Sequence, residues 1–185
     1  MIKEILEDAE QRMGKSIEVL SVAFSKIRTG RANPALLDGI VVPYYGTDTP
    51  LSQLATITVE DARSLVISPW EKMMIPEIEK AILRSDLGIT PASTGELVRL
   101  PLPALTEENR QHLIKVARGE TEHGRVAIRN IRRDALAHIK DFEKEGEIGE
   151  DDAHRALEQT QKLTDAKIAE VDHALAEKES DLLEI

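Results

Sequence analysis

The sequence predicts an α+β protein in which a small mixed domain is inserted into a long three-helix bundle. All eight prolines lie between residues 34 and 103, so residues 1–33 and 104–185 contain none. Because proline disrupts helix interiors, this distribution separates two helical ends from a middle region of different architecture. Both ends also carry apolar residues at intervals of three, four or seven, which is the spacing of one helix face.

The first helix is expected to run from residue 2 to about Gly30, because glycine commonly follows the last turn of a helix. Its single apolar stripe comprises Ile2, Leu6, Ala9, Met13, Leu20, Phe24 and Ile27.

Two further helices are expected near residues 106–144 and 151–183. Their stripes comprise Leu113, Ala117, Ile128, Ile131, Ala135, Ile139 and Phe142, and then Ala153, Leu157, Thr164, Ile168, Val171, Leu175 and Leu182. The first of these two stripes thins between residues 118 and 127. In the turn between the helices, Gly149 is expected to be the N-cap. Long helices with one apolar seam each are not stable alone, so the three are predicted to share one core.

The middle region combines strand patterns with one short helix. Residues 56–59 and 64–68 are β-branched runs that predict strands, and residues 43–50 have the turn chemistry of a hairpin. Pro76 is expected to open a helix that Gly88 closes. Thr94-Gly95 is expected to separate a strand at residues 89–90 from another at 97–100.

These patterns define two domains. We assign residues 1–30 and 105–185 to the bundle and residues 31–104 to the inserted domain. The chain crosses between them twice, near residues 29–31 and 101–105, and the two crossings predict a two-stranded hinge. The predicted hinge residues are Thr29, Gly30, Arg31, Pro103, Ala104 and Leu105.

The charge of the chain is unevenly distributed. The sequence has 34 acidic and 24 basic side chains, a formal net charge of −10. Residues 141–185 hold 15 acids and 5 bases, so this segment contains the whole excess, and residues 1–140 hold 19 of each. A net acidic chain argues against binding nucleic acid only if its basic residues are scattered.

The basic residues are instead concentrated on the second long helix. Arg118, Arg125, Arg129 and Arg132 are spaced by 7, 4 and 3 residues, which places them along one face beside the apolar stripe. We call these four the arginine ridge; Arg133 adjoins it. Guanidinium groups bind phosphate bidentately and stack on bases, so the ridge is a candidate RNA-binding surface. Two other interpretations stay open: a solvated face paired with the acidic third helix, or a surface for an acidic protein.

Other chemistry finds little support in the sequence. The chain has no cysteine, which excludes disulfides and thiolate metal sites and fits a reducing compartment. It has no glycine-rich phosphate loop, and His112 and His123 lie too far apart along one helix to share a metal ion. No signal or membrane segment is recognisable. We therefore expect a cytoplasmic protein that is not an enzyme and has no metal or cofactor.

Several motifs resemble the ribosome recycling factor family. They are residues 27–34 (IRTGRANP), 44–46 (YYG), 50–51 (PL), 68–70 (SPW) and 125–135 (RVAIRNIRRDA). The resemblance covers essentially the whole chain. It departs from the family at Leu136-Ala137, where many members have polar residues, and at Gly149, where serine is common.

The resemblance implies a fold and a function. The family fold is a three-helix bundle with an inserted β/α/β domain on a hinge, in an L-shaped outline that mimics tRNA. Family members act with elongation factor G, which hydrolyses GTP, to split the post-termination ribosome into subunits and release it from mRNA and tRNA. The bundle contacts large-subunit ribosomal RNA.

The resemblance also implies roles for particular arginines. Arg28, Arg110, Arg129 and Arg132 match the family's RNA-contacting arginines, and Arg118, Arg125 and Arg133 are added from their positions on or beside the ridge. We expect a monomer whose partners are the ribosome and elongation factor G. The alternative is a coiled-coil-type adaptor that binds an acidic protein through the arginine ridge, and such an adaptor would be expected to oligomerise.

Overall fold

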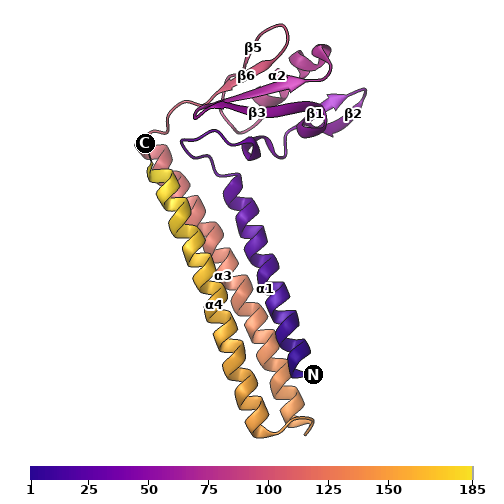
Figure 1. The fold of residues 1–185 in the computed structure, drawn as a ribbon, viewed down its shortest axis with the longest axis vertical. Helices are drawn as coiled ribbons and strands as arrows, with labels where there is room; N and C mark the ends of the chain where they lie inside the picture. Colours follow the sequence, from indigo (N-terminus) through magenta and orange to yellow (C-terminus); the bar gives the residue numbers. More distant parts are fainter. Residues whose placement is uncertain (185) are drawn as a thin grey trace. The chain divides into compact units, whose positions relative to one another are not determined.

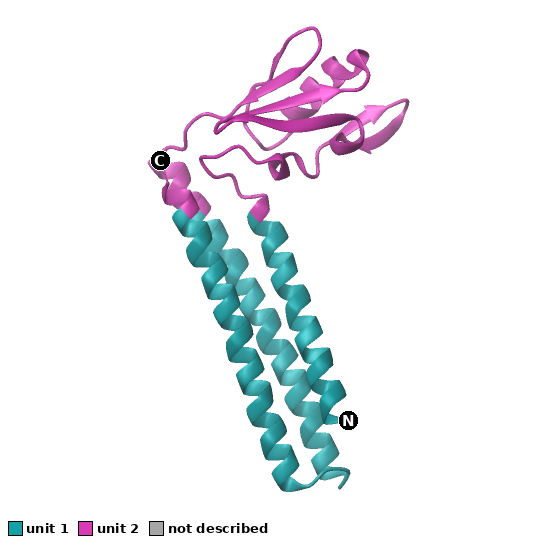
Figure 2. Ribbon diagram, in the orientation of Figure 1, with its two compact units in different colours: residues 1–24, 114–180 teal, residues 25–113, 181–185 magenta. Residues whose placement is uncertain are grey.

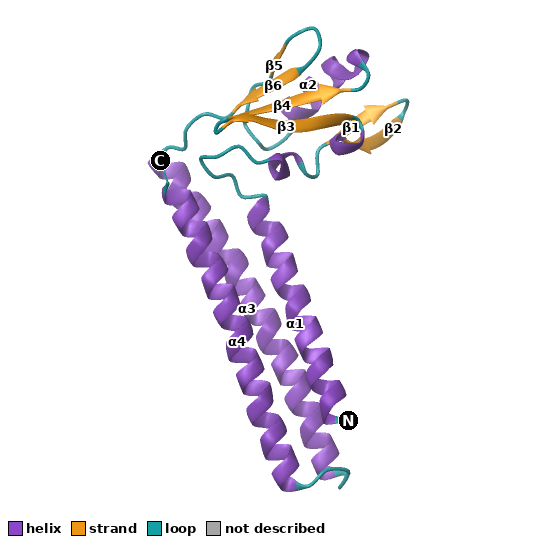
Figure 3. Ribbon diagram, viewed as in Figure 1, coloured by secondary structure: helices purple, strands orange, loops and turns teal. Residues whose placement is uncertain are grey.

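The computed structural model describes residues 1–184 and confirms the predicted α+β architecture (Figures 1 and 3). The chain divides into two compact units (Figure 2). Unit 1 contains residues 1–24 and 114–180, and unit 2 contains residues 25–113 together with the last residues of the chain from Asp181 on. Residues 25–30, 105–113 and those from Asp181 on therefore group with the sheet, whereas the sequence prediction assigned them to the bundle.

Unit 1 contains most of three long helices, whose bounds are α1 (Ile2–Ser25), α3 (Glu107–Lys144) and α4 (Glu150–Leu183). The last residue of α1, the first two turns of α3 and the last residues of α4 belong to unit 2. α1 and α4 run in the same direction and α3 runs opposite to both (Figure 1). The carbonyl of Gly149 accepts the first helical hydrogen bond of α4, from the backbone N–H of Ala153 at 3.0 Å, which confirms Gly149 as the N-cap. None of the helices within residues 1–184 is both long enough and apolar enough to cross a membrane.

The seam of unit 1 contains small and hydroxyl residues, of which the predicted stripes included Thr164 but not Thr121, Gly124 or Thr160. Thr121 and Gly124 are buried in the stretch of α3 where the apolar stripe thins, and Thr160 and Thr164 are buried on α4. Each of the three threonine hydroxyls donates a hydrogen bond of 2.7–2.8 Å to the carbonyl four residues earlier, so no hydroxyl is left unpaired in the core. At the start of the α3 stripe, Ile114 is buried and the expected Leu113 only partly so.

The end of α1 differs from the prediction. The helix stops at Ser25, five residues before Gly30. Beyond it, the Thr29 hydroxyl accepts a hydrogen bond of 3.2 Å from the backbone N–H of Arg31. This local side-chain bond gives the backbone an alternative to helical pairing. The predicted hinge residues therefore lie in irregular chain, all of it within unit 2.

Unit 2 contains two antiparallel sheets and one α-helix. The smaller sheet pairs β1 with β2, and the larger has the strand order β3-β4-β6-β5. The bounds are β1 (Val41–Tyr44), β2 (Thr47–Pro50), β3 (Ala55–Asp61), β4 (Ser64–Pro69), β5 (Ala92–Ser93), β6 (Val98–Pro101) and α2 (Ile75–Arg84). Short 3₁₀ helices lie at Pro34–Leu37, Leu51–Gln53 and Lys72–Met74.

The predicted hairpin is confirmed, and one predicted strand is displaced. Tyr45 and Gly46 join β1 to β2 with positive φ angles of 48° and 81°, the geometry of a two-residue hairpin turn. The strand expected at residues 89–90 forms instead at Ala92–Ser93, after Pro91. Proline has no N–H to donate to a strand ladder, which explains why pairing begins only beyond it.

The core of unit 2 lies between α2 and one face of the larger sheet. Leu65 and Ile67 of β4 and Leu100 of β6 point into it and are fully buried. Ile78 and Ile82 of α2 meet them and are equally buried. Ala62 and Arg63 form the short connection between β3 and β4 at the end of this sheet.

Candidate nucleic-acid interface

The arginine ridge lies along the edge of α3 that faces α4. Three of its members make side-chain hydrogen bonds to residues of α4, and all of these bonds lie within unit 1. The basic face that the sequence predicts beside the apolar stripe of α3 therefore lies next to α4. The partners on α4 differ along the ridge, and they decide how much positive charge each arginine presents.

The first two contacts are ion pairs. Arg118 donates from Nε to Oε1 of Glu179 at 2.6 Å. Arg125 donates from Nε to Oδ1 of Asp172 at 3.1 Å and also from Nη2. The hydrogen bond to Asp172 is the largest cause of the raised pKa of Arg125. For these two arginines, the interpretation that the ridge pairs with the acidic third helix is confirmed.

The third contact is different in kind. Arg132 donates from Nη1 to Oε1 of Gln161 at 3.3 Å, and a glutamine amide has no charge to neutralise it. The Gln161 amide nitrogen in turn donates to Oδ1 of Asp165 at 2.8 Å, so the nearby carboxylate is engaged by the glutamine. Nε of Arg132 is buried and has no hydrogen-bond partner among the described residues. Arg132 therefore has an unpaired charge.

Arg129 and Arg133 make no hydrogen bond or ion pair with α4 among the described residues. Arg129 reaches Oε1 of Glu122 on its own helix at 3.3 Å, in an exposed and therefore weak pair. Arg133 is exposed and makes no ion pair within residues 1–184. The stretch from Arg129 to Arg133 is thus the part of the ridge with the least charge compensation.

Arg28 and Arg110 belong to unit 2 and lie in different surroundings. Arg28 donates from Nη2 to the carbonyl of Pro103, and burial lowers the pKa of its guanidinium. Arg110 pairs through Nη1 with Glu107 at 3.1 Å, and its side chain is only 15% exposed. Nε of each is buried without a partner among the described residues, which leaves hydrogen-bonding capacity unused.

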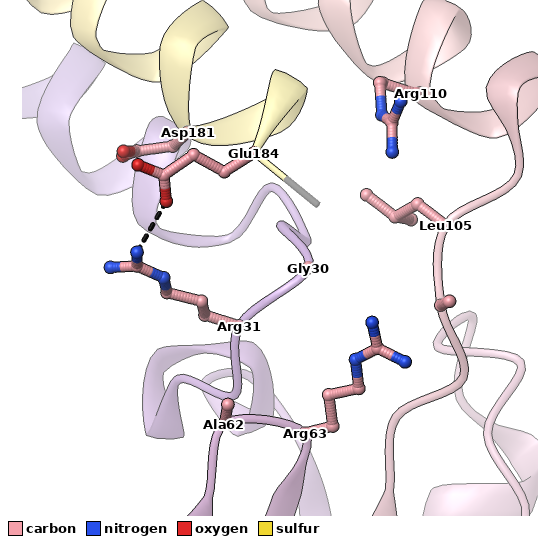
Figure 4. Close-up of a pocket in the computed structure, with 9 residues that line it drawn as sticks. Gly30, Arg31, Ala62, Arg63, Leu105, Arg110, Asp181 and Glu184 are labelled. Carbon is pink, nitrogen blue, oxygen red and sulfur yellow. Dashed lines mark ion pairs between the residues drawn. The ribbon is translucent and has the colours of Figure 1, made fainter.

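A cavity of about 350 Å³ lies beside Arg110, within unit 2. Figure 4 shows the guanidinium groups of Arg110 and of Arg63, in the β3–β4 connection, directed into it. The sequence analysis did not single out Arg63. The opposite wall carries Arg31, which pairs with Glu184 at 2.6 Å. Asp181 also lines the cavity, so acids balance much of its basic charge.

The predicted hinge segments are tied to the β3–β4 connection. The backbone N–H of Ala32 donates to the carbonyl of Ala62 at 2.7 Å, and that of Leu102 donates to the carbonyl of Arg63 at 2.7 Å. Arg28 and Pro103 join the two segments directly. The two predicted crossings thus lie side by side within unit 2, and the movement expected of them stays a prediction.

Residues 1–184 contain no group of three or more histidine, aspartate or glutamate side chains that could hold a metal ion. The site residues that sequence reasoning missed are Gln161, Asp165, Asp172 and Glu179 on α4. Their positions contain a usable signal, because Glu179, Asp172 and Asp165 repeat every seven residues, as Arg118, Arg125 and Arg132 do. Matching heptads on antiparallel helices place such residues opposite each other.

Known proteins resemble the chain over its whole length. The family model described as "Ribosome recycling factor" matches residues 20–183. Relatives named "Ribosome-recycling factor" include a protein of Hahella chejuensis, 60% identical over 185 residues, and one of Marinomonas sp., 58% identical over 185 residues. In both cases the similarity covers 100% of this chain and 100% of the relative.

Two solved structures are also similar. The solution structure of a ribosome recycling factor matches with a TM-score of 0.78 and 39% identity, over 100% of this chain and 98% of the other. The second describes the T. thermophilus ribosome recycling factor and E. coli elongation factor G bound to the E. coli post-termination complex. Its TM-score is 0.69 at 44% identity, over 100% of both chains.

Proposed function

Because the chain belongs to the ribosome recycling factor family and acts in ribosome recycling, we propose that it binds large-subunit ribosomal RNA through its exposed or unpaired arginines, chiefly Arg132. The observation that carries this proposal is that Arg132 has no carboxylate partner. Its charge faces a neutral glutamine, and its buried Nε has no partner among the described residues. An RNA phosphate supplies the negative charge that this side chain lacks.

The other arginines support the same proposal to different degrees. Arg129 and Arg133 lie beside Arg132 and are exposed, so they can reach phosphates of the same strand. Arg28 and Arg110 each retain an unpaired Nε. Arg118 and Arg125 support it least, because both are already paired with carboxylates of α4.

The similarity to a recycling factor structure in a complex supports the mechanism of action. The chain acts with elongation factor G on the post-termination ribosome, and the two separate it into subunits. We propose that GTP is used by elongation factor G, and that this chain needs no cofactor and is not an enzyme. The hinge residues Thr29, Gly30, Arg31, Pro103, Ala104 and Leu105 are proposed to let the two domains move during splitting.

We further propose that the protein works as a cytoplasmic monomer, in the compartment where post-termination ribosomes arise. The alternative function, an adaptor for an acidic protein, gains no support from the comparisons. A self-associating adaptor and a monomeric factor differ in sedimentation, so the mass in solution separates them.

Arg132→Gln tests the RNA-binding proposal, because glutamine keeps the helix propensity and removes the charge. We expect weaker cosedimentation with large ribosomal subunits and a smaller salt dependence of binding, by about one unit of the log–log slope. Arg155→Gln, an exposed arginine on α4, is the matched control and should bind normally. Light scattering with elongation factor G and GTP should show slower subunit splitting. Unchanged affinity of Arg132→Gln would overturn the proposal.

A further inference from the structure

Three arginines of α3 form a ladder with α4. Arg118, Arg125 and Arg132 recur every seven residues, and Glu179, Asp172 and Asp165 recur every seven residues in the opposite direction. The first two rungs are closed by carboxylates, at 2.6 Å and 3.1 Å. At the third rung the carboxylate of Asp165 bonds to Gln161 instead, and Arg132 meets the amide oxygen of Gln161.

We propose that α4 selects which ridge arginines bind RNA: Glu179 and Asp172 withhold Arg118 and Arg125, and Gln161 leaves Arg132 available. Along α3, contact with RNA is then confined to Arg129 and Arg132 of the ridge and to the adjoining Arg133. This inference rests on the proposed RNA-binding function and adds to it a specificity role for three residues of α4.

Burial cannot explain why Arg118 would be withheld. Its side chain is 63% exposed, so a phosphate could approach it freely were Glu179 absent. Arg125 is 24% exposed, but its partner Asp172 is 53% exposed and the pair lies at the surface. The carboxylates themselves are therefore what competes with RNA for these two arginines.

The competition is effective because the carboxylates are part of the same folded unit. A phosphate must displace a carboxylate that the fold holds at hydrogen-bonding distance, whereas at Arg132 it displaces only a neutral amide. The affinity of the protein for RNA of arbitrary shape, which would contact any exposed arginine, is lowered in this way. A ribosomal site that matches the Arg129–Arg133 end loses little, so the ladder increases discrimination rather than affinity.

The first experiment closes the third rung. Gln161→Glu places a carboxylate against Arg132 without removing any arginine. We expect about a fivefold or larger loss of affinity for purified large subunits at low salt, a substantial part of the Arg132→Gln effect. The control is Gln159→Glu, which adds the same charge to an exposed position two residues away, and it should change affinity less than twofold. Equal losses in both variants, or no loss in Gln161→Glu, overturn the proposal.

The second experiment opens the first two rungs. The double variant Asp172→Asn with Glu179→Gln should bind poly(U) about fivefold more tightly at low salt. Its log–log salt slope should steepen by between about 0.7 and about 1.4. Each fully freed arginine adds about 0.7 for single-stranded RNA, and Arg118 is fully freed, whereas Arg125 keeps its bond to Glu122 at 3.2 Å. Affinity for large subunits should change less than twofold.

The control for the second experiment is Glu158→Gln with Glu177→Gln. These residues pair with histidines of the same helix, so the variant loses the same charge without touching an arginine. An equal gain in poly(U) binding by both double variants would assign the effect to net charge and overturn the proposal. Thermal melting by circular dichroism verifies that each variant remains folded.

Failure of this inference is distinguishable from failure of the proposed function. If Arg132→Gln weakens binding to large subunits while Gln161→Glu binds like the unaltered protein, the RNA-binding role stands and the selection by α4 is wrong. If Arg132→Gln binds normally, the proposed function itself fails.

Discussion

The two units have cores of different composition. Unit 2 packs branched aliphatic side chains such as Ile67 and Ile78 between a sheet and a helix, and both are fully buried. Much of the seam of unit 1 is filled by small residues, among them Ala117, Ala156 and Gly124. The stability of unit 2 therefore depends on large side chains that fill the space between sheet and helix. The stability of unit 1 depends more on small residues that let its helices approach closely.

Close approach has a functional consequence in unit 1. Small seam residues let α3 and α4 pack near enough for arginine side chains of one to reach carboxylates of the other. The ladder between Arg118 and Glu179 and between Arg125 and Asp172 depends on that spacing. A larger side chain in the seam would disturb both the stability and the charge pattern, whereas a smaller one in unit 2 would disturb stability alone.

The largest effect is expected from removing volume in unit 2. Ile67→Ala in β4 leaves a cavity under α2 and should lower the free energy of unfolding of that unit by about 2–5 kcal/mol. Hydrogen exchange of the unit 2 amides measures this loss. Val66→Ala, on the other face of the same strand and only partly buried, should cost much less. Equal losses at the two positions would contradict a one-sided core.

Adding volume should be the damaging change in unit 1. Ala156 is fully buried beside Ile139 and Ala153, so Ala156→Leu should overpack the seam and cost about 1–3 kcal/mol. Chemical denaturation followed by circular dichroism measures it. Ala166→Leu, at an exposed position of α4, is the control and should be nearly neutral. A neutral Ala156→Leu would show that the helices are free to move apart.

The same contrast explains what the sequence could predict. Proline placement separated the helical ends from the middle region, and the apolar spacing located all three long helices, because each rests on a strong local rule. Thr121 and Gly124 were missed because hydrophobic periodicity does not register small or hydroxyl residues, although a close-packed seam requires them. The end of α1 was misplaced because the prediction used Gly30 as the stop signal, whereas the helix ends at Ser25.

The candidate site was predictable only in part. Arginine spacing placed the ridge on one face of α3, and resemblance to the family selected Arg129 and Arg132 from it. Which arginines are neutralised depends on the register between α3 and α4, a relation between residues far apart in sequence. Gln161 shows why sequence alone was insufficient. It matters because it is the neutral partner of Arg132, whereas Arg118 and Arg125 each have an acidic partner.

A smaller effect should distinguish the glycines of the two units. Gly119 lies in α3 without a positive φ, and a methyl group added at its Cα would meet no atom within 4 Å. Gly119→Ala should therefore stabilise unit 1 by about 0.5–1 kcal/mol. Gly46, with φ of 81° in the hairpin turn of unit 2, should respond in the opposite direction, with Gly46→Ala costing about 1 kcal/mol. Melting temperatures of the two variants check both signs. A destabilised Gly119→Ala would reveal a close contact on that face of α3.

The smallest expected effect concerns pH and the surface of unit 1. The hydrogen bond from Arg125 is the largest cause of the lowered pKa of Glu122, and Arg129 adds to it. A carboxyl with a lowered pKa in the folded state stabilises the fold above its unfolded pKa, and this contribution is lost as pH falls through the folded pKa. Glu122→Gln should therefore melt at a slightly lower temperature than the unaltered protein at neutral pH. The difference should disappear in acid, as melting temperatures measured from neutral to acidic pH would show.

The control is Glu120→Gln, because Glu120 makes no ion pair among residues 1–184, and this variant should show no such pH dependence. A difference that persists in strong acid would mean that Glu122 stabilises α3 through packing or helix propensity, because the protonated carboxyl retains both but has lost its charge.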